Sequence, residues 1–437
     1  MLNFFRKNKV LIFWGILIEV IYLSVIILEN IFPALLEKKI LLYSFFIISS
    51  LSFLILLTKK IKISESKTTL KIIILFSIIF NLTLLFSFPL GPGDIYNYLF
   101  RAEVFTVYHQ NPFLIAPVNF PQNPLSKYIS DLAKSTPTIY GPLWMIISFL
   151  PALLAFNNIF VGVMLFKLLA IMFFFLCFWI IYKIISLLDF DKKNKYFLLF
   201  LWNPLLLFEI ANEGHNDIIM VFFILLALYY LIREKFYSVI PLLTLSVMIK
   251  YISIIIIPFF LIFILKQKNK SNKFFINIIK NWKFIIINLI ISLIIIITLF
   301  APFLNSNQIF QGILHQAGMI SKSHLSFFPF IISQISNEVL VVKIISYFAF
   351  FLFYLFILFH NQPQNIKQLI NKILLAFILY LFVASFWLQA WYFIWIIPLL
   401  IITGKKYYNF AIIISVFAII HQGYNLNLLI SDFIKSF

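Results

Sequence analysis

Long apolar runs separated by short polar segments follow one another along most of the chain. A bilayer-spanning helix needs about 20 predominantly apolar residues, and shorter runs are accepted where two of them meet at a polar turn. In lipid each run must satisfy its own backbone hydrogen bonds, so the runs are predicted to be helices. They cover residues 10–32, 40–58, 70–88, 159–186, 197–211, 217–232, 238–249, 251–265, 284–301, 338–359, 373–388, 391–403 and 409–421.

Composition leads to the same conclusion as the pattern. Hydrophobic residues make up 63% of the chain and charged residues only 11%, with a mean hydropathy of +1.04. A soluble domain has roughly 45–50% apolar and about 25% charged residues. The sequence therefore predicts an all-α polytopic membrane protein with a bundle of about 12 or 13 transmembrane helices. Residues 1–437 are expected to form one transmembrane domain.

The net charge of +19 is explained by membrane topology, and no nucleic-acid partner is predicted. Lysines cluster in short loops between the apolar runs, which is how the positive-inside rule sets orientation. Beginning with the N-terminus in the cytoplasm, alternation of sides places most of the 34 basic residues inside. The first run follows Arg6, Lys7 and Lys9 and is too long for an ordinary signal peptide, so it is predicted to be retained. We expect a multi-pass protein of the plasma membrane.

This topology divides the chain into four parts. Residues 10–88 hold three helices, 89–158 form a long extracytoplasmic loop with interfacial helices, 159–421 hold the remaining helices, and 422–437 are a tail. The segment 143–156 is apolar but short, and making it a span would place the following lysines outside. The single cysteine, Cys177, lies inside an apolar run, so no disulfide framework is expected.

Ionisable residues at membrane depth are costly, and each is a candidate for a functional site. If a helix begins after Gly93, the side chains of Asp94, Tyr98 and Arg101 share one stripe. A carboxylate beside an arginine at a membrane boundary suits proton abstraction and phosphate recognition. A helix-capping aspartate and a solvated arginine are the structural alternative.

A second polar cluster lies between the runs 197–211 and 217–232. It follows Trp202-Asn203-Pro204 and contains Glu209 and then Glu213, His215, Asn216 and Asp217 around one glycine. A turn does not need so many polar groups, and we predict that the last four bind substrate. The alternative is an ordinary loop in which Asn216 or Asp217 caps the next helix.

Lys250 interrupts the apolar stretch between Ser238 and Leu265. At the centre of one straight helix it would cost about 2.5–3.5 kcal/mol on insertion scales. A helical hairpin with Lys250 at its apex avoids this cost, and the ammonium could then hold a phosphate. A snorkelling lysine is the alternative.

The turn at Gln389, Trp391 and Tyr392 offers aromatic rings and an amide that could contact a sugar, although an interfacial aromatic belt explains the two rings equally well. His315, Lys322 and His324 are weaker candidates in the segment 302–337. The sequence contains no metal-ligand spacing, P-loop or nucleophile elbow. No cofactor is therefore required, and a divalent cation is compatible with the sequence.

These segments, in this order, resemble the GT-C superfamily of membrane glycosyltransferases. The similarity is to the catalytic subunit of glycosylphosphatidylinositol mannosyltransferase I and to bacterial polyprenol-phosphomannose-dependent alpha-mannosyltransferases. The matching stretches are Asp94-Ile95-Tyr96, Asn111-Pro112-Phe113, Thr138-Ile139-Tyr140-Gly141-Pro142-Leu143, Trp202-Asn203-Pro204-Leu205, Gly214-His215-Asn216-Asp217, Met248-Ile249-Lys250-Tyr251 and Gln389-Ala390-Trp391-Tyr392.

The resemblance implies an inverting transferase that uses a polyprenyl-phosphate sugar and a glycan or lipid-linked acceptor. Asp94 matches the family's functional acidic residue and would be the catalytic base. Where the family often has Asp-x-Asp, this chain has Tyr96 at the second position, which bears on metal dependence. Donor phosphate would be held by Arg101, Lys250 and Lys322, and sugar and acceptor by Tyr98, Tyr140, Glu213, His215, Asn216, Asp217, Gln389, Trp391 and Tyr392.

Two other functions remain open from the sequence. A lipid-linked saccharide flippase or transporter would also need intramembrane charges and broken helices, together with charges near the midplane and repeat symmetry. No repeat is visible here. A polymerase or ligase of undecaprenyl-linked glycans would use related chemistry on two lipid-linked substrates.

Overall fold

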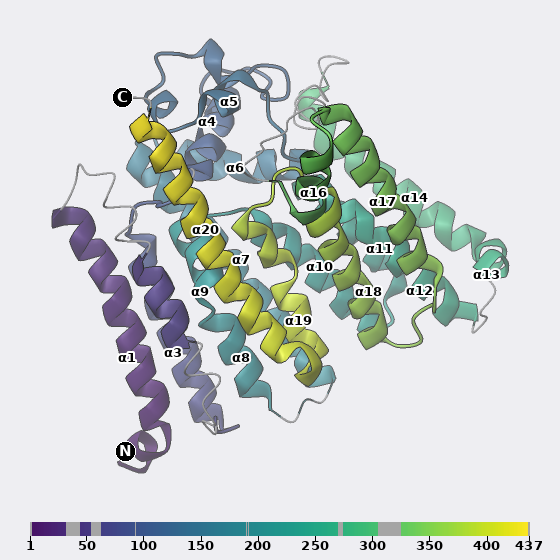
Figure 1. Ribbon diagram of the computed structural model, residues 1–437. Coiled ribbons are helices and arrows are strands. Elements are labelled where there is room, and N and C mark those ends of the chain that lie inside the picture. The colour runs from purple at the N-terminus through teal and green to yellow at the C-terminus, as the bar shows by residue number, and fades with distance from the viewer. Residues whose placement is uncertain are drawn as a thin grey trace.

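The computed structural model describes residues 2–31, 44–53, 63–91, 93–188, 190, 192–269, 274–304 and 325–435. Within these ranges the chain forms helices and no strands, which confirms the predicted all-α class. The helices run side by side as a bundle, and a group of shorter helices covers one end of it (Figure 1). We call this the capped end. The N-terminus of the first helix lies at the opposite end.

The first part of the bundle consists of three apolar helices that lead to the capped end. Ser66 begins the third of them, because its hydroxyl oxygen accepts a hydrogen bond from Thr69 N. At the other end of that helix, Lys167 donates to Leu84 O and Ser87 O although its side chain is fully buried. The lysine thus adds hydrogen bonds to carbonyls in the last turn of the helix and just beyond it. The three helices are α1 (Leu2–Ile31), Ser44–Phe53 and α3 (Lys67–Leu85).

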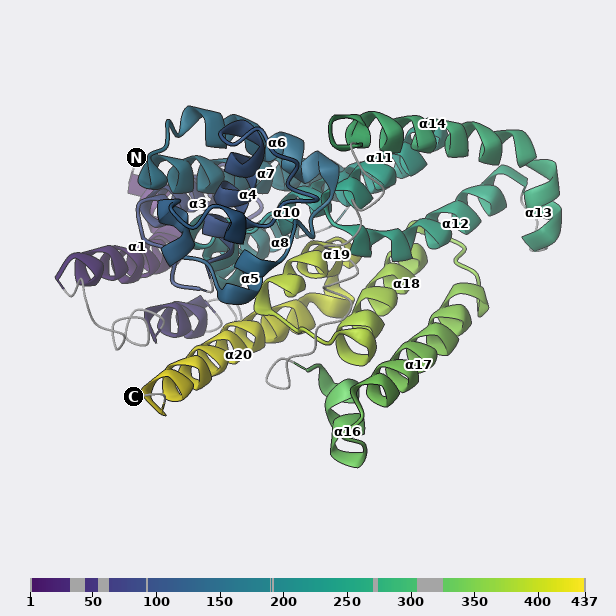
Figure 2. The same cartoon turned by 90° about the horizontal axis from the view of Figure 1, so that it is seen from above.

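The predicted loop 89–158 forms the cap itself, and its helices lie across the others when seen from above (Figure 2). Pro142 begins its last helix at the first helical position, where no backbone N–H is needed. At about 1.5 Å per residue this helix is shorter than the roughly 30 Å hydrocarbon layer. The interfacial or re-entrant location of 143–156 stays a prediction. The elements are α4 (Asp94–Thr106), η1 (Pro117–Asn119), η2 (Pro124–Lys127), α5 (Asp131–Ser135) and α6 (Pro142–Leu154).

The centre of the bundle differs from the prediction at one point. The run 197–211 was expected to be one span, but the helix ends at Leu201 and restarts at Pro204. Proline cannot continue a helix, and Asn203 Oδ1 caps the new one by accepting from Leu205 N and Leu206 N. The central elements are α7 (Ile159–Leu187), α8 (Lys193–Leu201), α9 (Pro204–Leu207), the π-helical turn η3 (Phe208–Asn212), α10 (Asp217–Ile232) and α11 (Phe236–Ile249).

The second half of the chain continues the bundle. The chain is extended at Lys250, so the stretch 238–265 is interrupted there as predicted. The last helix runs on past residue 421, where the sequence predicted a tail. The elements are η4 (Tyr251–Ile256), α12 (Ile257–Asn269), α13 (Phe274–Lys280), α14 (Trp282–Phe300), η5 (Ala301–Phe303), α16 (Phe327–Ile335), α17 (Val339–Phe359), α18 (Ile366–Leu379), η7 (Tyr380–Ala384), η8 (Ala390–Trp395), α19 (Ile397–Thr403), η9 (Lys405–Tyr407) and α20 (Tyr408–Lys435).

Seven helical segments among the described residues are long and apolar enough to cross a membrane, so the chain is a multi-pass membrane protein. Five shorter apolar helices accompany them: Ser44–Phe53, Pro142–Leu154, Asp217–Ile232, Phe236–Ile249 and Ala390–Thr403. The span Val339–Phe359 is only 11% buried over its most apolar window, and Trp282–Phe303 is 17% buried. Their large exposed apolar side chains identify these two spans as lipid-facing.

One backbone contact joins the cap to the centre of the bundle. Gly141 N donates a hydrogen bond to Ile249 O over 3.1 Å. Gly141 directly precedes α6, and Ile249 is the last residue of α11. A Cβ atom at residue 141 would overlap Met248 O and Met248 C. The approach is possible because glycine has no side chain. It fixes the start of α6 next to Lys250.

We expect Gly141→Ala to lower the stability of the protein by about 1–3 kcal/mol, because backbone atoms must separate to admit the methyl group. The measurement is the apparent unfolding temperature of the detergent-solubilised protein. Gly162→Ala is the matched control, since its methyl group would meet the movable end of the Leu99 side chain instead of backbone. Equal destabilisation by the two variants would contradict this role of Gly141.

Candidate active site

Hydrogen bonds to the turn before α10 hold the segment that leads into α4. Glu213 Oε1 accepts hydrogen bonds from Leu90 N at 2.7 Å and Gly91 N at 2.9 Å, and its side chain is buried. Asn212 Oδ1 also accepts from Leu90 N. Gly93 then adopts a positive φ of 81°, and Asp94 is the first residue of α4. The position of Asp94 is therefore fixed by a residue more than a hundred positions later.

Asp94 faces a buried histidine. His215 Nε2 lies 3.6 Å from Asp94 Oδ2, and His215 Nδ1 lies 2.9 Å from Glu209 Oε2. The side chains of His215 and Glu209 are 1% and 0% exposed, whereas that of Asp94 is 27% exposed. The imidazole thus connects an enclosed carboxylate to one that solvent can reach.

His215 lies in the turn before α10, outside the seven long apolar spans. Burial alone opposes protonation, but the interactions with Asp94 and Glu209 outweigh it and raise the pKa of His215 to about 10. The two carboxyl groups therefore favour the charged form of the ring, whose Nε2 faces Asp94 and whose Nδ1 faces Glu209.

A second charged pair lies next to this group. Lys250 Nζ is 2.7 Å from Asp217 Oδ1, and Trp395 Nε1 donates to the same oxygen. The lysine side chain is 18% exposed, and Asp217 is fully buried. Lys250 sits at the break between α11 and η4, and Asp217 is the first residue of α10. The ammonium therefore keeps part of its surface open to a ligand.

Aromatic rings from η8 surround both pairs. Trp391 stacks on His215 with ring centroids 4.3 Å apart, and Tyr392 stacks on Trp395 at 4.6 Å. Lys250 Nζ lies 5.0 Å from the centre of the Tyr392 ring, within the range of a cation–π contact. Gln389, which directly precedes η8, is buried.

Two tyrosines of the cap complete the arrangement. Tyr98 OH lies 3.5 Å from Asn216 Oδ1, the limit of a hydrogen bond, and the Tyr98 ring meets that of Tyr140 edge-on at 5.1 Å. Asn216 Nδ2 and Asp217 Oδ2 are buried and have no hydrogen-bond partner among the described residues. Buried polar atoms are usually satisfied, so these two are available to a ligand.

The comparison with known families identifies the class of protein. Residues 31–266, more than half of the chain, match the MptA_B family model, described as the N-terminal domain of alpha-(1->6)-mannopyranosyltransferase. The chain belongs to this family. It is therefore a glycosyltransferase, and a mannosyltransferase by family. The match includes Asp94, His215 and Lys250, and ends before η8. No curated protein matches the chain.

The structure of this mannosyltransferase brings together eleven residues that the sequence singled out from distant segments. Their individual roles stay predictions. They are Asp94, Tyr98, Tyr140, Glu213, His215, Asn216, Asp217, Lys250, Gln389, Trp391 and Tyr392. Lys322, like His315 and His324, lies outside the described residues.

Arg101 has a different environment from the one expected of a phosphate ligand. Its guanidinium is 2% exposed and donates to Asn97 Oδ1, Thr136 O and Ala133 O over 2.8–3.1 Å. The two carbonyl bonds hold α5 and its C-terminal cap residue against α4. The structure therefore accounts for Arg101 as a residue that stabilises the cap, and phosphate binding by Arg101 stays a prediction.

Two residues in contact with this group were not among the predicted site residues. Glu209 contacts His215, and Trp395 contacts Asp217. Glu209 carried a usable signal, because a carboxylate inside an apolar run is expensive unless it is paired. No group of three or more His, Cys, Asp or Glu side chains within the described ranges is arranged to hold a metal ion. Metal dependence of the mannosyltransferase stays a prediction.

The raised pKa of His215 predicts a pH-dependent contribution to stability. The pKa lies above the ordinary 6.5, so the stabilisation is complete below about pH 6.5 and is lost as the pH rises through about 10. We expect His215→Gln to lower the apparent unfolding temperature at pH 6, and the gap from wild type to narrow by pH 10. A gap that stays constant over this range would show that the charge of His215 does not stabilise the fold.

Proposed function

We propose that this protein is an inverting mannosyltransferase that takes mannose from a polyprenyl-phosphate donor. The acceptor is a glycan or a lipid-linked saccharide on the extracytoplasmic side. One observation carries the proposal. A partly exposed carboxylate, Asp94, and a partly exposed ammonium, Lys250, are both anchored on the turn that leads into α10, through His215 and Asp217. Base and anion-binding group are thus present in one place.

The reaction is a single displacement at the anomeric carbon. The acceptor hydroxyl oxygen forms a bond to this carbon, and the bond from the carbon to the donor phosphate oxygen breaks. Asp94 accepts the hydroxyl proton, and polyprenyl phosphate leaves with the bonding electrons. A single displacement inverts the anomeric configuration. Asp94 suits this role because it is the carboxylate of the His215 group that solvent reaches.

His215 and Glu209 act through Asp94. The imidazolium, held by Glu209 on one nitrogen and by stacking on Trp391, presents its other nitrogen to Asp94 Oδ2. The remaining Asp94 oxygen can then face the acceptor. The side chains of His215 and Glu209 are buried, so these two groups need little reorganisation when the acceptor binds.

Lys250 stabilises the leaving phosphate. Negative charge grows on the departing oxygens, and a fixed ammonium nearby lowers the energy of that state. Asp217 and the rings of Tyr392 and Trp395 hold the ammonium in place. Lys322 and Arg101 are kept as further predicted phosphate ligands. The unpartnered amide of Asn216 suits a sugar hydroxyl.

The proposed side of the membrane rests on the predicted cytoplasmic location of the N-terminus and of most lysines. The N-terminus of α1, which we propose to be cytoplasmic, lies at the end of the bundle opposite to α4 and α5 (Figure 1). The site at the start of α4 is then extracytoplasmic. Charges at one end of the bundle and membership of a transferase family both disfavour the flippase alternative. No described feature favours a polymerase or ligase.

Asp94→Asn should lower kcat for mannosyl transfer by about 10²–10⁴-fold, because the amide cannot accept the proton. The assay is transfer from polyprenyl-phosphate mannose to octyl alpha-mannoside by the purified protein, with the linkage of the product determined by NMR. Glu103→Gln is the control, since Glu103 lies on the same helix and only accepts from Asn123 Nδ2. Retained transfer by Asp94→Asn would remove Asp94 as the base.

Lys250→Gln should reduce kcat and kcat/KM for the same donor by about 10–100-fold, which corresponds to about 1.4–2.8 kcal/mol of lost stabilisation of the leaving group. Lys250→Arg should recover part of the loss, because it keeps the charge. A change in KM alone, with kcat intact in the glutamine variant, would assign Lys250 to uniform donor binding instead.

A further inference from the structure

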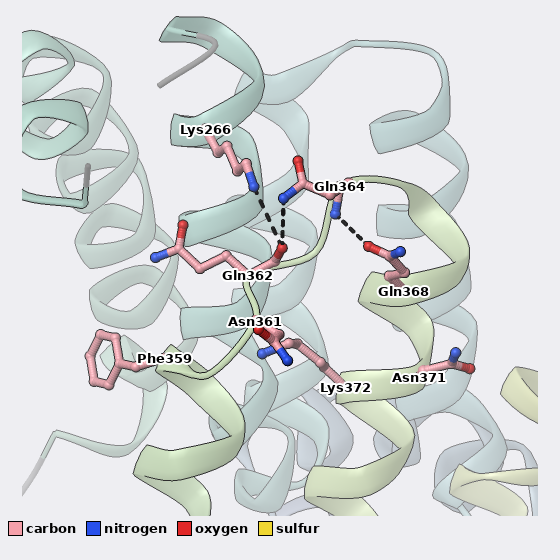
Figure 3. Close-up of a pocket in the computed structure, with 8 residues that line it drawn as sticks. All are labelled: Lys266, Phe359, Asn361, Gln362, Gln364, Gln368, Asn371 and Lys372. Atoms are coloured by element: carbon pink, nitrogen blue, oxygen red, sulfur yellow. Dashed lines mark hydrogen bonds between the residues drawn. The ribbon is translucent and has the colours of Figure 1, made fainter. Parts of the chain in front are cut away.

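A polar cavity lies at the end of the bundle opposite to the candidate active site. It has a volume of about 720 Å³ and lies where α12 and α17 end and α18 begins. Figure 3 shows its lining side chains, which come from these three helices and from the loop between α17 and α18. They are Lys266, Phe359, Asn361, Gln362, Gln364, Gln368, Asn371 and Lys372.

The lining is positively charged. Two of the eight residues are lysines, five carry amides, and none of these eight described residues is acidic. Lys266 and Lys372 are only 7% and 9% exposed, unlike lysines that extend freely into water. The first turn of α18 lies at the same place and adds the positive end of its dipole.

Contacts within the protein use only part of the hydrogen-bonding capacity of these lysines. Lys372 Nζ donates to Ile357 O and His360 O, which leaves one of its three N–H groups. Among the described residues, Lys266 Nζ has a single partner, Gln362 O, at the long distance of 3.5 Å (Figure 3). The loop contacts alone therefore do not account for two enclosed cations.

The cavity continues into an apolar surface. Phe359 lines it and is 47% exposed, and α17, which ends at Phe359, faces lipid over most of its length. The exposed side chains of that helix include Phe348, Leu352 and Phe356. A ligand held here would meet cations at its head and an apolar helix along its body. This is the chemistry of an anionic amphiphile, and basic pockets between helix ends bind such head groups.

We propose that the cavity between α12, α17 and α18 binds the phosphate head group of an anionic membrane lipid, with the acyl chains along α17. Lys266 and Lys372 contact the phosphate, and the amide of Gln368 offers donors to its oxygens. The site shares no residue with the candidate active site, so the test of lipid binding does not depend on the proposed function.

The test uses the full chain purified in a neutral detergent. Phosphatidylglycerol is titrated against phosphatidylcholine, and the apparent unfolding temperature reports binding. We expect saturable stabilisation by phosphatidylglycerol only. Lys266→Gln should weaken the apparent affinity about fivefold, which corresponds to about 1 kcal/mol for one basic residue near a lipid head group. Lys266→Arg should retain binding. Lys266 is chosen because Lys372 also holds two carbonyls, and its loss could unfold the loop.

Lys283→Gln is the matched control, since this exposed lysine lies near the start of α14 and contacts only the Trp282 ring in the described structure. Equal stabilisation of wild type and Lys266→Gln by phosphatidylglycerol would overturn the proposal, as would equal effects of the two lipids on the wild type. A parallel titration with inorganic phosphate distinguishes a lipid head group from a soluble phosphate as the ligand. Stabilisation by phosphate alone, abolished in Lys266→Gln and not exceeded by the lipid, would assign the site to a soluble phosphate and overturn the lipid assignment.

Discussion

The structure depends on ionised groups being paired with one another in a largely apolar bundle. A lone buried charge in such surroundings is costly, but the two basic side chains of the candidate active site each lie against a carboxyl group. His215 lies between Asp94 and Glu209, and Lys250 lies against Asp217. The partners come from segments far apart in the chain, so the pairing holds the cap and the central helices together. The same pairing leaves two groups, Asp94 and Lys250, partly exposed, and these are the two that the proposed reaction uses.

Helix interruptions supply these charged groups. Asp94 and Asp217 each stand at the first position of a helix, Lys250 stands between two helices, and Glu209 lies in a π-helical turn. Interruptions in membrane helices are tolerated where they are enclosed by protein or line a cavity. Here the breaks are the means by which an otherwise apolar chain places polar atoms at one end of the bundle. The apolar runs of the sequence therefore determine the helices, and the polar residues at the breaks between them supply the candidate active site.

The positions of the helices could be predicted from the sequence because periodic apolar runs report burial in lipid directly. The run 217–232 coincides with α10, and the break at Lys250 was predicted from the cost of a central lysine. The break at Asn203-Pro204 was missed, because a long apolar run concealed a proline that can begin a helix as well as end one. The gathering of Asp94, His215, Lys250 and Trp391 was predicted from topology. The environment of Arg101 was not, because two of its three partners are backbone carbonyls, which have no sequence signature.

The contact between Gly141 and Ile249 has a further consequence for motion. Because backbone packs directly against backbone, the start of α6 and the end of α11 cannot slide past one another without first separating. A displacement of α6 away from the end of α11 would break this hydrogen bond. Lys250, the next residue after Ile249, is therefore tied through the main chain to the start of the last helix of the cap.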